Sequence, residues 1–101
     1  MMKPKKILVT DTAQDSVEEI ISYLTSKFSV KLAKKFVDDL DLFYGTLSKH
    51  QELGFEVSSK KAIRCFVFKT YTLIFYTVTD DSVVIILFRD SRSSGSLDYF
   101  L

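Results

Sequence analysis

The stretch "IRCFVFKTYTLIFYTVTDDSVVIILFRDSR", residues 63–92, contains three runs of β-branched and aromatic residues separated by short polar breaks. The runs cover residues 62–68, 71–78 and 82–89, and the breaks "KT" and "TDD" are short enough for hairpin turns. This pattern predicts an antiparallel meander of three strands. Because apolar residues are dense on both faces of the runs, we expect one face to pack on other elements and the other to be only partly solvated.

Upstream of the meander, the composition of "KKILVT", residues 5–10, is that of a short strand. Asp15, followed three residues later by Glu18, has the spacing of a capping box, so a helix is expected to start close to Asp15. Five apolar residues then recur at helical spacing on one face: Val17, Ile20, Ile21, Leu24 and Phe28.

Ser29 can cap a second helix, whose apolar residues keep the 3.6-residue period over more than four turns. These residues are Leu32, Ala33, Phe36, Val37, Leu40, Phe43, Tyr44 and Leu47. Since so few residues separate the two helices, an antiparallel hairpin is expected. The charged residues between the apolar positions are expected to face water, namely Lys31, Lys34, Lys35, Asp38, Asp39 and Asp41. Residues 48–61 show no sustained period and are predicted to form a loop.

The predicted fold class is therefore α+β, with the order β-α-α-β-β-β and the helix hairpin packed on a small antiparallel sheet. A length of 101 residues suits a single domain, 1–101, with a short apolar C-terminal tail over residues 95–101. The tail "GSLDYFL" is too apolar to remain solvated without cost. It is expected to pack on the domain or against a partner chain, and self-association is expected when the protein is isolated.

Composition excludes several kinds of function. The formal net charge is +1, which is weak support for an avid nucleic-acid binder, and no sequence-specific nucleic-acid binding is expected. One cysteine and one histidine cannot make a usual zinc site, and three scattered glycines make no phosphate-binding loop, so neither metal nor cofactor is expected. No secretion signal or membrane span is evident in the sequence. The single cysteine, Cys65, is expected to be a buried thiol, and a cytoplasmic location is predicted.

The arginines of the predicted sheet leave alternatives open. Alternation directs Ile63, Cys65 and Val67 to one face and Arg64 to the other, together with Phe66 and Phe68. Arg64 is then either an edge cation over aromatic rings or a cation held for an anionic or carbonyl-rich partner. Similarly, "LFRDSRSSG", residues 87–95, suits a solvated turn, a catalytic edge for nucleic acid, or a recognition tip for a protein.

Taken together, these elements resemble the RelE/ParE superfamily, the toxin half of type II toxin–antitoxin pairs. The resemblance runs from about Asp11 to Arg92. Within the stretch quoted first, an arginine opens the first strand, a "Y-x-V-x-D-D" hairpin follows, and the last strand ends in an arginine-bearing tip. In the helical part, the residues that match the spaced pattern of the family are Ala13, Ser16, Ile20, Tyr23, Leu24, Phe28, Ala33, Phe36, Leu40 and Leu47. The hairpin motif is matched by Tyr76, Val78, Asp80 and Asp81.

The resemblance implies a toxin of the plasmid-stabilisation type that inhibits growth and is neutralised by a cognate antitoxin. RelE-like members cut messenger RNA on the ribosome with basic side chains of the sheet, whereas ParE-like members poison DNA gyrase and lack that catalytic set. The nucleases commonly carry an arginine near the start of the middle strand, where this chain has Thr72 and Leu73. The ParE-like activity is therefore favoured, without catalysis, and a ribosome-dependent mRNA endoribonuclease is the alternative.

On this reading the residues expected to bind the target or the antitoxin are Arg64, Arg89, Arg92 and Tyr99. If the chain were a nuclease, the candidate catalytic residues would be Arg64, Lys69, Arg92 and Tyr99. RNA cleavage through the 2′-hydroxyl needs a base, an acid and cations that stabilise a phosphorane, and this set is thin for all three roles.

Overall fold

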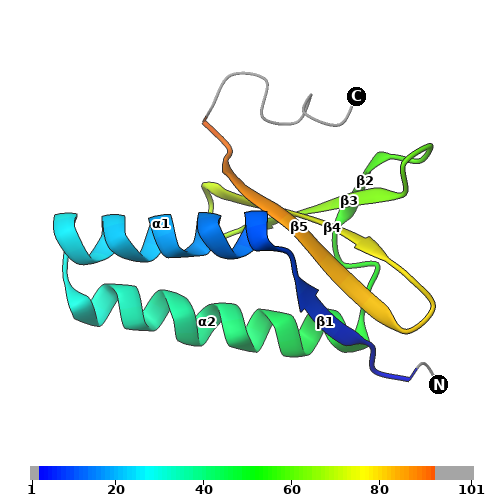
Figure 1. Cartoon of the computed structure of the whole chain (residues 1–101), viewed down its shortest axis with the longest axis horizontal. Coiled ribbons are helices and arrows are strands. Elements are labelled where there is room, and N and C mark those ends of the chain that lie inside the picture. The colour runs from blue at the N-terminus through cyan, green and yellow to red at the C-terminus, as the bar shows by residue number, and fades with distance from the viewer. Residues whose placement is uncertain (1–2, 93–101) are drawn as a thin grey trace.

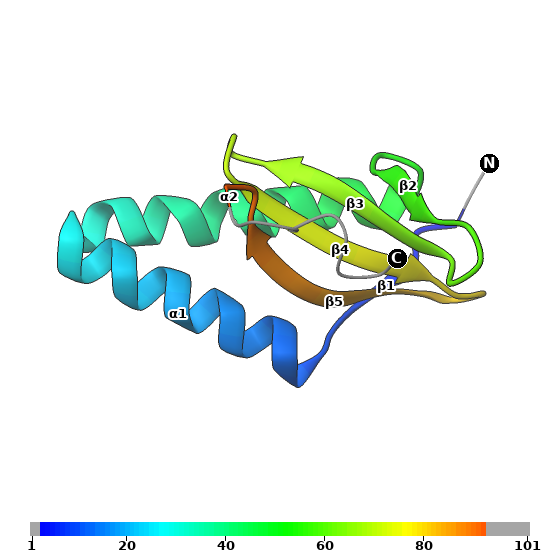
Figure 2. The ribbon, with the colours of Figure 1, turned by 90° about the horizontal axis from the view of Figure 1, so that it is seen from above.

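The computed structural model describes residues 3–92, which form two layers, a helix hairpin and a twisted five-stranded sheet (Figure 1). In chain order the elements are β1 (Lys6–Val9), α1 (Asp11–Lys27), α2 (Val30–Lys49), β2 (Phe55–Ser58), β3 (Ile63–Phe68), β4 (Thr72–Val78) and β5 (Ser82–Asp90). Seen from above, the sheet crosses over α2, α1 lies beside it, and the connection between the helices reaches past the strands (Figure 2). The predicted α+β fold, with a helix hairpin on a sheet, is confirmed.

The spatial order of the sheet is β1-β5-β4-β3-β2. The predicted meander of β3, β4 and β5 is confirmed, with Phe68 opposite Thr72 and Val78 opposite Val83. The sheet is mixed rather than wholly antiparallel, because β1 runs parallel to β5. That pairing joins the first and last strands of the chain, which the local sequence pattern does not encode.

The expected loop over residues 48–61 is wrong in its second half, because Phe55–Ser58 forms β2. This short strand pairs antiparallel with β3, placing Phe55 opposite Cys65 and Glu56 opposite Arg64. Its four residues, Phe-Glu-Val-Ser, alternate apolar and polar side chains, but a run of four between polar segments is too short to predict a strand by itself. The strand exists because the edge of β3 offers unpaired backbone groups, which is a tertiary effect.

The expected start of the first helix near Asp15 is also wrong, because α1 begins at Asp11 with Thr10 as its N-cap. The Thr10 hydroxyl accepts a hydrogen bond from the Ala13 amide at 3.1 Å and donates one to the Ile86 carbonyl at 2.7 Å. The cap therefore also ties the start of α1 to β5. Asp15 lies in the body of the helix, exposed to solvent.

The second helix begins as predicted, with the Ser29 hydroxyl accepting from the Leu32 amide at 3.0 Å. The buried residues of α2 all belong to the predicted apolar set: Ala33, Phe36, Leu40, Phe43 and Leu47. Phe28, expected on the apolar face of the first helix, is instead 63% exposed. It ends α1 at the hairpin connection, where no strand is available to cover it (Figure 2).

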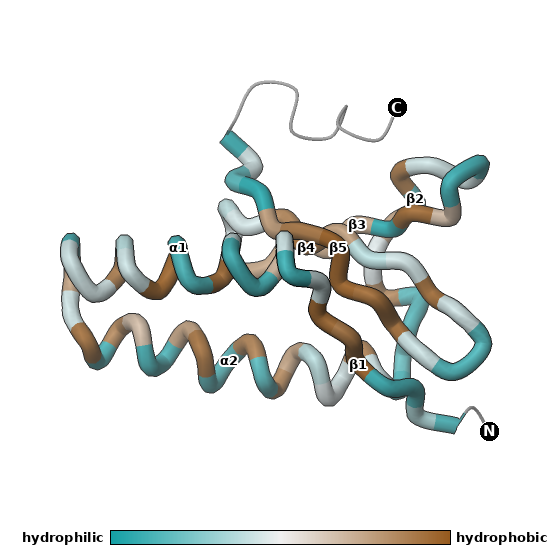
Figure 3. Tube along the Cα trace, viewed as in Figure 1, coloured by the Kyte–Doolittle hydropathy of each residue, from teal (hydrophilic) through white to brown (hydrophobic). Residues whose placement is uncertain are grey.

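Both faces of the sheet are apolar, and Figure 3 shows the hydrophobic segments running along β1, β4 and β5. On the helix side, Phe66 and Phe68 pack with Phe36 and Phe43, with ring centroids 4.5–5.7 Å apart. On the opposite side lies a second-face cluster, which consists of Ile63, Cys65, Leu73, Phe75 and Leu87. The predicted alternation along β3 is therefore confirmed, and the second face is more deeply buried than expected.

Candidate functional site

A groove of about 660 Å³ lies between the helix hairpin and the end of the sheet where β3, β4 and β5 meet the hairpin. Its apolar lining comes from both helices and from β5, through Ile20, Leu24, Leu32, Phe36 and Phe88. The groove is also lined by four cationic side chains, those of Lys35, Lys69, Arg89 and Arg92, and by two carboxylates, those of Glu19 and Asp90. An apolar groove with charged groups of both signs around it suits an amphipathic protein segment.

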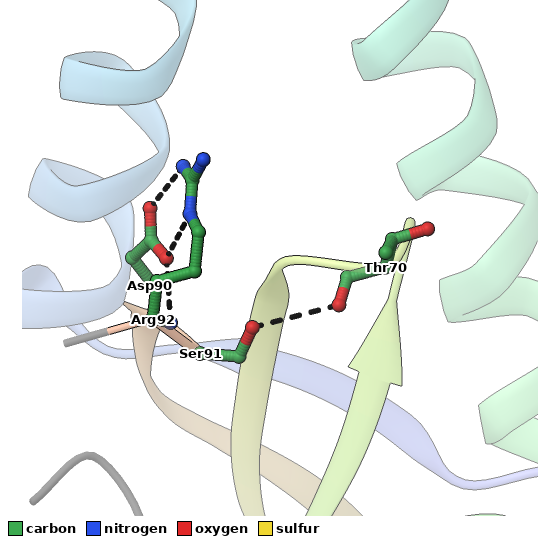
Figure 4. A network of polar contacts seen from close by, with 4 residues as sticks. All are labelled: Thr70, Asp90, Ser91 and Arg92. Atoms are coloured by element: carbon green, nitrogen blue, oxygen red, sulfur yellow. Dashed lines mark hydrogen bonds and ion pairs between the residues drawn. The ribbon is translucent and has the colours of Figure 1, made fainter.

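The arginine-bearing tip predicted at the end of the last strand forms one side of this groove (Figure 4). Arg92 binds Asp90 through two side-chain hydrogen bonds, from Nε at 3.0 Å and from Nη2 at 2.6 Å, and its backbone amide donates a third at 2.8 Å. The guanidinium also stacks on the Tyr71 ring, 4.3 Å from its centroid. Three contacts therefore orient a side chain that remains 65% exposed.

These contacts shift the pKa values of both groups. The hydrogen bonds from the Arg92 side chain and amide lower the pKa of Asp90 to about 2, and the same carboxylate raises the pKa of Arg92. Both groups therefore stay ionised throughout the physiological range. Arg92 and Asp90 thus form a local ion pair at this tip.

The turn between β3 and β4 forms another part of the groove. Lys69 and Thr70 both have positive φ, 52° and 68°, which costs roughly 1–2 kcal/mol per non-glycine residue. The Lys69 ammonium binds the Asp39 carboxylate on α2, and Lys35 binds the same carboxylate at 3.0 Å. Bonds from Lys69 and then Lys35 lower the pKa of Asp39.

The expectation that Asp39 simply faces water is therefore wrong. Its side chain is 23% exposed and holds two cations at the groove, one of them 30 residues away in the chain. No local pattern predicts this contact, because it depends on how the turn packs on α2. Tyr71, which carries the Arg92 guanidinium, was likewise missed by sequence reasoning.

Arg64 lies apart from the groove. Its Nε and Nη2 donate to the Gly54 carbonyl at 3.0 and 2.6 Å, and Nη2 also reaches the Glu52 carbonyl at 3.2 Å. The buried Tyr76 hydroxyl completes this loop, accepting from the Gly54 amide and donating to the Gln51 carbonyl, both at 2.8 Å. Arg64 therefore meets the carbonyl groups of its own chain, in the loop that leads into β2.

Of the predicted site residues, the structure brings Lys69, Arg89 and Arg92 together at the groove and places Arg64 near the other end of β3. Tyr99 and residues 93–95 of the tip lie outside the described residues. Burial raises the pKa of the Cys65 thiol to about 11, which keeps it protonated and unsuited to nucleophilic attack.

Within residues 3–92, no group of three or more histidine, cysteine or acidic side chains is placed to hold a metal ion. Neither helix in this part of the chain is long and apolar enough to cross a membrane.

Comparisons with known proteins agree with this architecture. The chain matches the family described as "ParE toxin of type II toxin-antitoxin system, parDE" over residues 7–94. Among solved structures, a chain from the chromosomal ParDE toxin–antitoxin system of P. aeruginosa superposes with a TM-score of 0.71 at 16% identity, covering 85% of this chain and 95% of that one. A conserved hypothetical protein from Helicobacter pylori gives a TM-score of 0.53 at 16% identity, covering 85% and 93%.

A search of curated protein sequences found no match. The two structural likenesses are too distant in sequence to show more than the fold. The family match, by contrast, spans almost the whole of the described chain. The chain therefore belongs to the ParE toxin family of type II toxin–antitoxin systems.

Proposed function

We propose that this chain inhibits growth by binding a target protein, DNA gyrase, and that a cognate antitoxin neutralises it by covering the groove beside α1. The observation that carries the proposal is the groove itself, which joins an apolar lining to cations held in fixed positions. Arg92 is oriented by Asp90 and Tyr71, and Lys69 by Asp39. Cations oriented before binding lose little conformational freedom when a partner docks, which favours protein recognition.

The same contacts weaken the case for RNA cleavage. A carboxylate beside each of Arg92 and Lys69 opposes the approach of a phosphate, and reduces what these cations could contribute to a phosphorane. The single histidine, His50, caps the C-terminal end of α2 and is not among the residues that line the groove. Among the described residues, the groove thus offers no histidine as a general base.

The first experiment tests the groove. Arg92→Ala should weaken binding of purified gyrase or antitoxin by about 2 kcal/mol, roughly 30-fold in Kd, because it removes an oriented interface cation. The pair with Asp90 is largely exposed, so the unfolding midpoint in urea should change little. Lys60→Ala, at an exposed cation outside the groove, is the matched control and should bind as wild type does. Equal affinity of all three proteins would refute the proposed role of the groove.

The second experiment identifies the target. Synthesis of DNA and of protein is followed separately after the chain is induced in a bacterium that lacks the antitoxin. Early loss of DNA synthesis with filamentation is expected for a gyrase-binding toxin. Early loss of translation, together with site-specific mRNA cleavage on purified ribosomes, would refute the gyrase assignment and establish the nuclease alternative.

Arg64 needs a separate control, because the expectation that it also contacts the target rests on the sequence alone. Arg64→Ala removes hydrogen bonds to the Gly54 and Glu52 carbonyls, so it can reduce toxicity by destabilising the fold as well as by weakening target binding. We therefore expect this variant to lower the unfolding midpoint, unlike Arg92→Ala. Toxicity lost at full stability would instead place Arg64 in the target interface.

A further inference from the structure

The second-face cluster is buried although it lies on the side of the sheet away from the helices. Cys65 and Phe75 are 0% exposed, and Ile63, Leu73 and Leu87 are at most 7% exposed. Every buried residue of the cluster comes from β3, β4 or β5, and no buried residue of either helix belongs to it. Among the described elements, no helix therefore covers this face.

An uncovered sheet face does not give such burial. In a sheet with one solvated face, residues alternate between buried and exposed, yet Leu73, Ile74, Phe75 and Tyr76 are buried in succession. On the same face, Phe55, which pairs with Cys65, and Val67, which pairs with Leu73, are 47% and 46% exposed. The burial is thus confined to the centre of the face and ends at β2 and at the tip of β3, as expected for a narrow covering segment.

The chain's own C-terminal residues have the right starting point and length to be that segment. The described chain ends at Arg92, directly after β5, where the Ser91 amide is tied to the Tyr71 carbonyl at 2.8 Å. The pair Phe75–Leu87 lies three residues along the strands from the pair Thr72–Asp90, a distance of roughly 10 Å. Residues 93–101 can span up to about 30 Å when extended, which is ample to cross the cluster.

The composition of this segment also matches the face. In the sequence "SSGSLDYFL", Leu97, Tyr99 and Leu101 alternate with Asp98 and Phe100. In an extended chain, alternate residues point to opposite sides, so three large apolar side chains would face the sheet together. We propose that residues 93–101 return across the second face of the sheet and cover its apolar cluster with Leu97, Tyr99 and Leu101.

This inference is independent of the proposed target and of toxicity. It makes the C-terminal segment part of the hydrophobic core, and it assigns the second face to the chain itself rather than to a partner. The chain supplies its own reporter, because Cys65 is its single cysteine and lies fully buried in the covered face, paired with Phe75. A thiol reagent can react with Cys65 only when the cover opens.

The test measures the rate of Cys65 labelling by a thiol reagent at pH 8 in the full-length protein. Leu97→Ser with Leu101→Ser should increase the rate at least about tenfold, because the cover is no longer apolar. Phe100→Ser is the matched control on the opposite side of the segment and should label nearly as wild type does. Thr10→Ala, which weakens the fold at α1, controls for labelling through global unfolding. Urea unfolding shows the folded fraction of each variant.

Addition of a synthetic peptide of residues 93–101 to the double variant should restore slow labelling, and the same peptide with both leucines replaced by serine should not. Three results would overturn the proposal. The double variant could label as slowly as wild type, Phe100→Ser or Thr10→Ala could accelerate labelling as much as the double variant does, or protection of wild type could depend on protein concentration. The last result would assign the cover to a second copy of the chain.

Discussion

Gly54 stands where the loop before β2 passes against β3, and replacing it with alanine should destabilise the protein strongly. A Cβ at this position would lie 2.6 Å from the Cys65 carbonyl oxygen and 2.9 Å from its carbonyl carbon, both backbone atoms that cannot rotate away. It would also lie 2.8 Å from the Tyr76 hydroxyl. To make room the loop must move, and that hydroxyl then loses its 2.8 Å bond with the Gly54 amide.

The expected cost has two parts. Overpacking of a close contact costs about 1–3 kcal/mol, and a buried amide left without a partner costs a further 1–3 kcal/mol. Since part of the strain is relieved by the same movement that breaks the bond, we expect a total of about 3 kcal/mol. For a domain of this size, that corresponds to a fall in Tm of roughly 12–24 °C.

The assay is equilibrium unfolding in urea, followed by far-UV circular dichroism, with the melting curve as a second measurement. Gly45→Ala is the matched control, because it lies inside the C-terminal part of α2 and nothing lies within 4 Å of the added carbon. That change should stabilise the protein by about 0.5–1 kcal/mol, since alanine loses less conformational entropy in a helix. A cost below about 1 kcal/mol for Gly54→Ala, or a loss of stability for Gly45→Ala, would refute the reasoning.

Three further predictions concern other contacts. Tyr76→Phe should lower the free energy of unfolding by about 2–4 kcal/mol in urea, because it leaves a buried amide and a buried carbonyl of the loop without partners; a change below 1 kcal/mol would contradict this. Thr10→Ala should lower the free energy of unfolding by about 1–2 kcal/mol and Asp15→Ala by less than about 0.5 kcal/mol, because Thr10 is the N-cap of α1. A larger loss for Asp15→Ala than for Thr10→Ala would show that Asp15 caps the helix. Because its folded pKa of about 2 lies below the ordinary value of 3.8, Asp90 should favour the folded state above about pH 4, and this contribution should disappear as the pH falls through about 2. NMR titration should show the Asp90 pKa rising toward 3.8 in Arg92→Ala, and an unchanged value would exclude Arg92 as the cause.

Local sequence predicts those parts of the fold that depend on residues close together in the chain, namely the strands of the meander, the buried face of α2 and its N-cap. The period of two over residues 62–89 determined three strands and the side to which the residues of β3 point, with Cys65 and Phe68 on opposite faces. In β5 a register shift against β4 breaks this period, so that Ile85 and Leu87, two residues apart, lie on opposite faces. The period of 3.6 determined the buried face of α2, and the hydroxyl of Ser29 determined where that helix begins. Each of these depends on residues within about four positions of one another, so a linear pattern carries the information.

What only the tertiary structure decided involves partners far apart in the chain. β2 exists because β3 has a free edge, and Thr10 rather than Asp15 caps α1 because the chain leaves β1 beside β5, where the Thr10 hydroxyl also finds the Ile86 carbonyl. Asp39 reaches Lys69 across 30 residues to form part of the groove. The sequence places Arg64 with the other arginines as a partner-binding residue. In the structure its guanidinium donates hydrogen bonds to the Gly54 and Glu52 carbonyls, in the loop before β2. Such pairings depend on which surfaces meet when the helix hairpin and the sheet pack together, and sequence periodicity records only that each surface is apolar or charged.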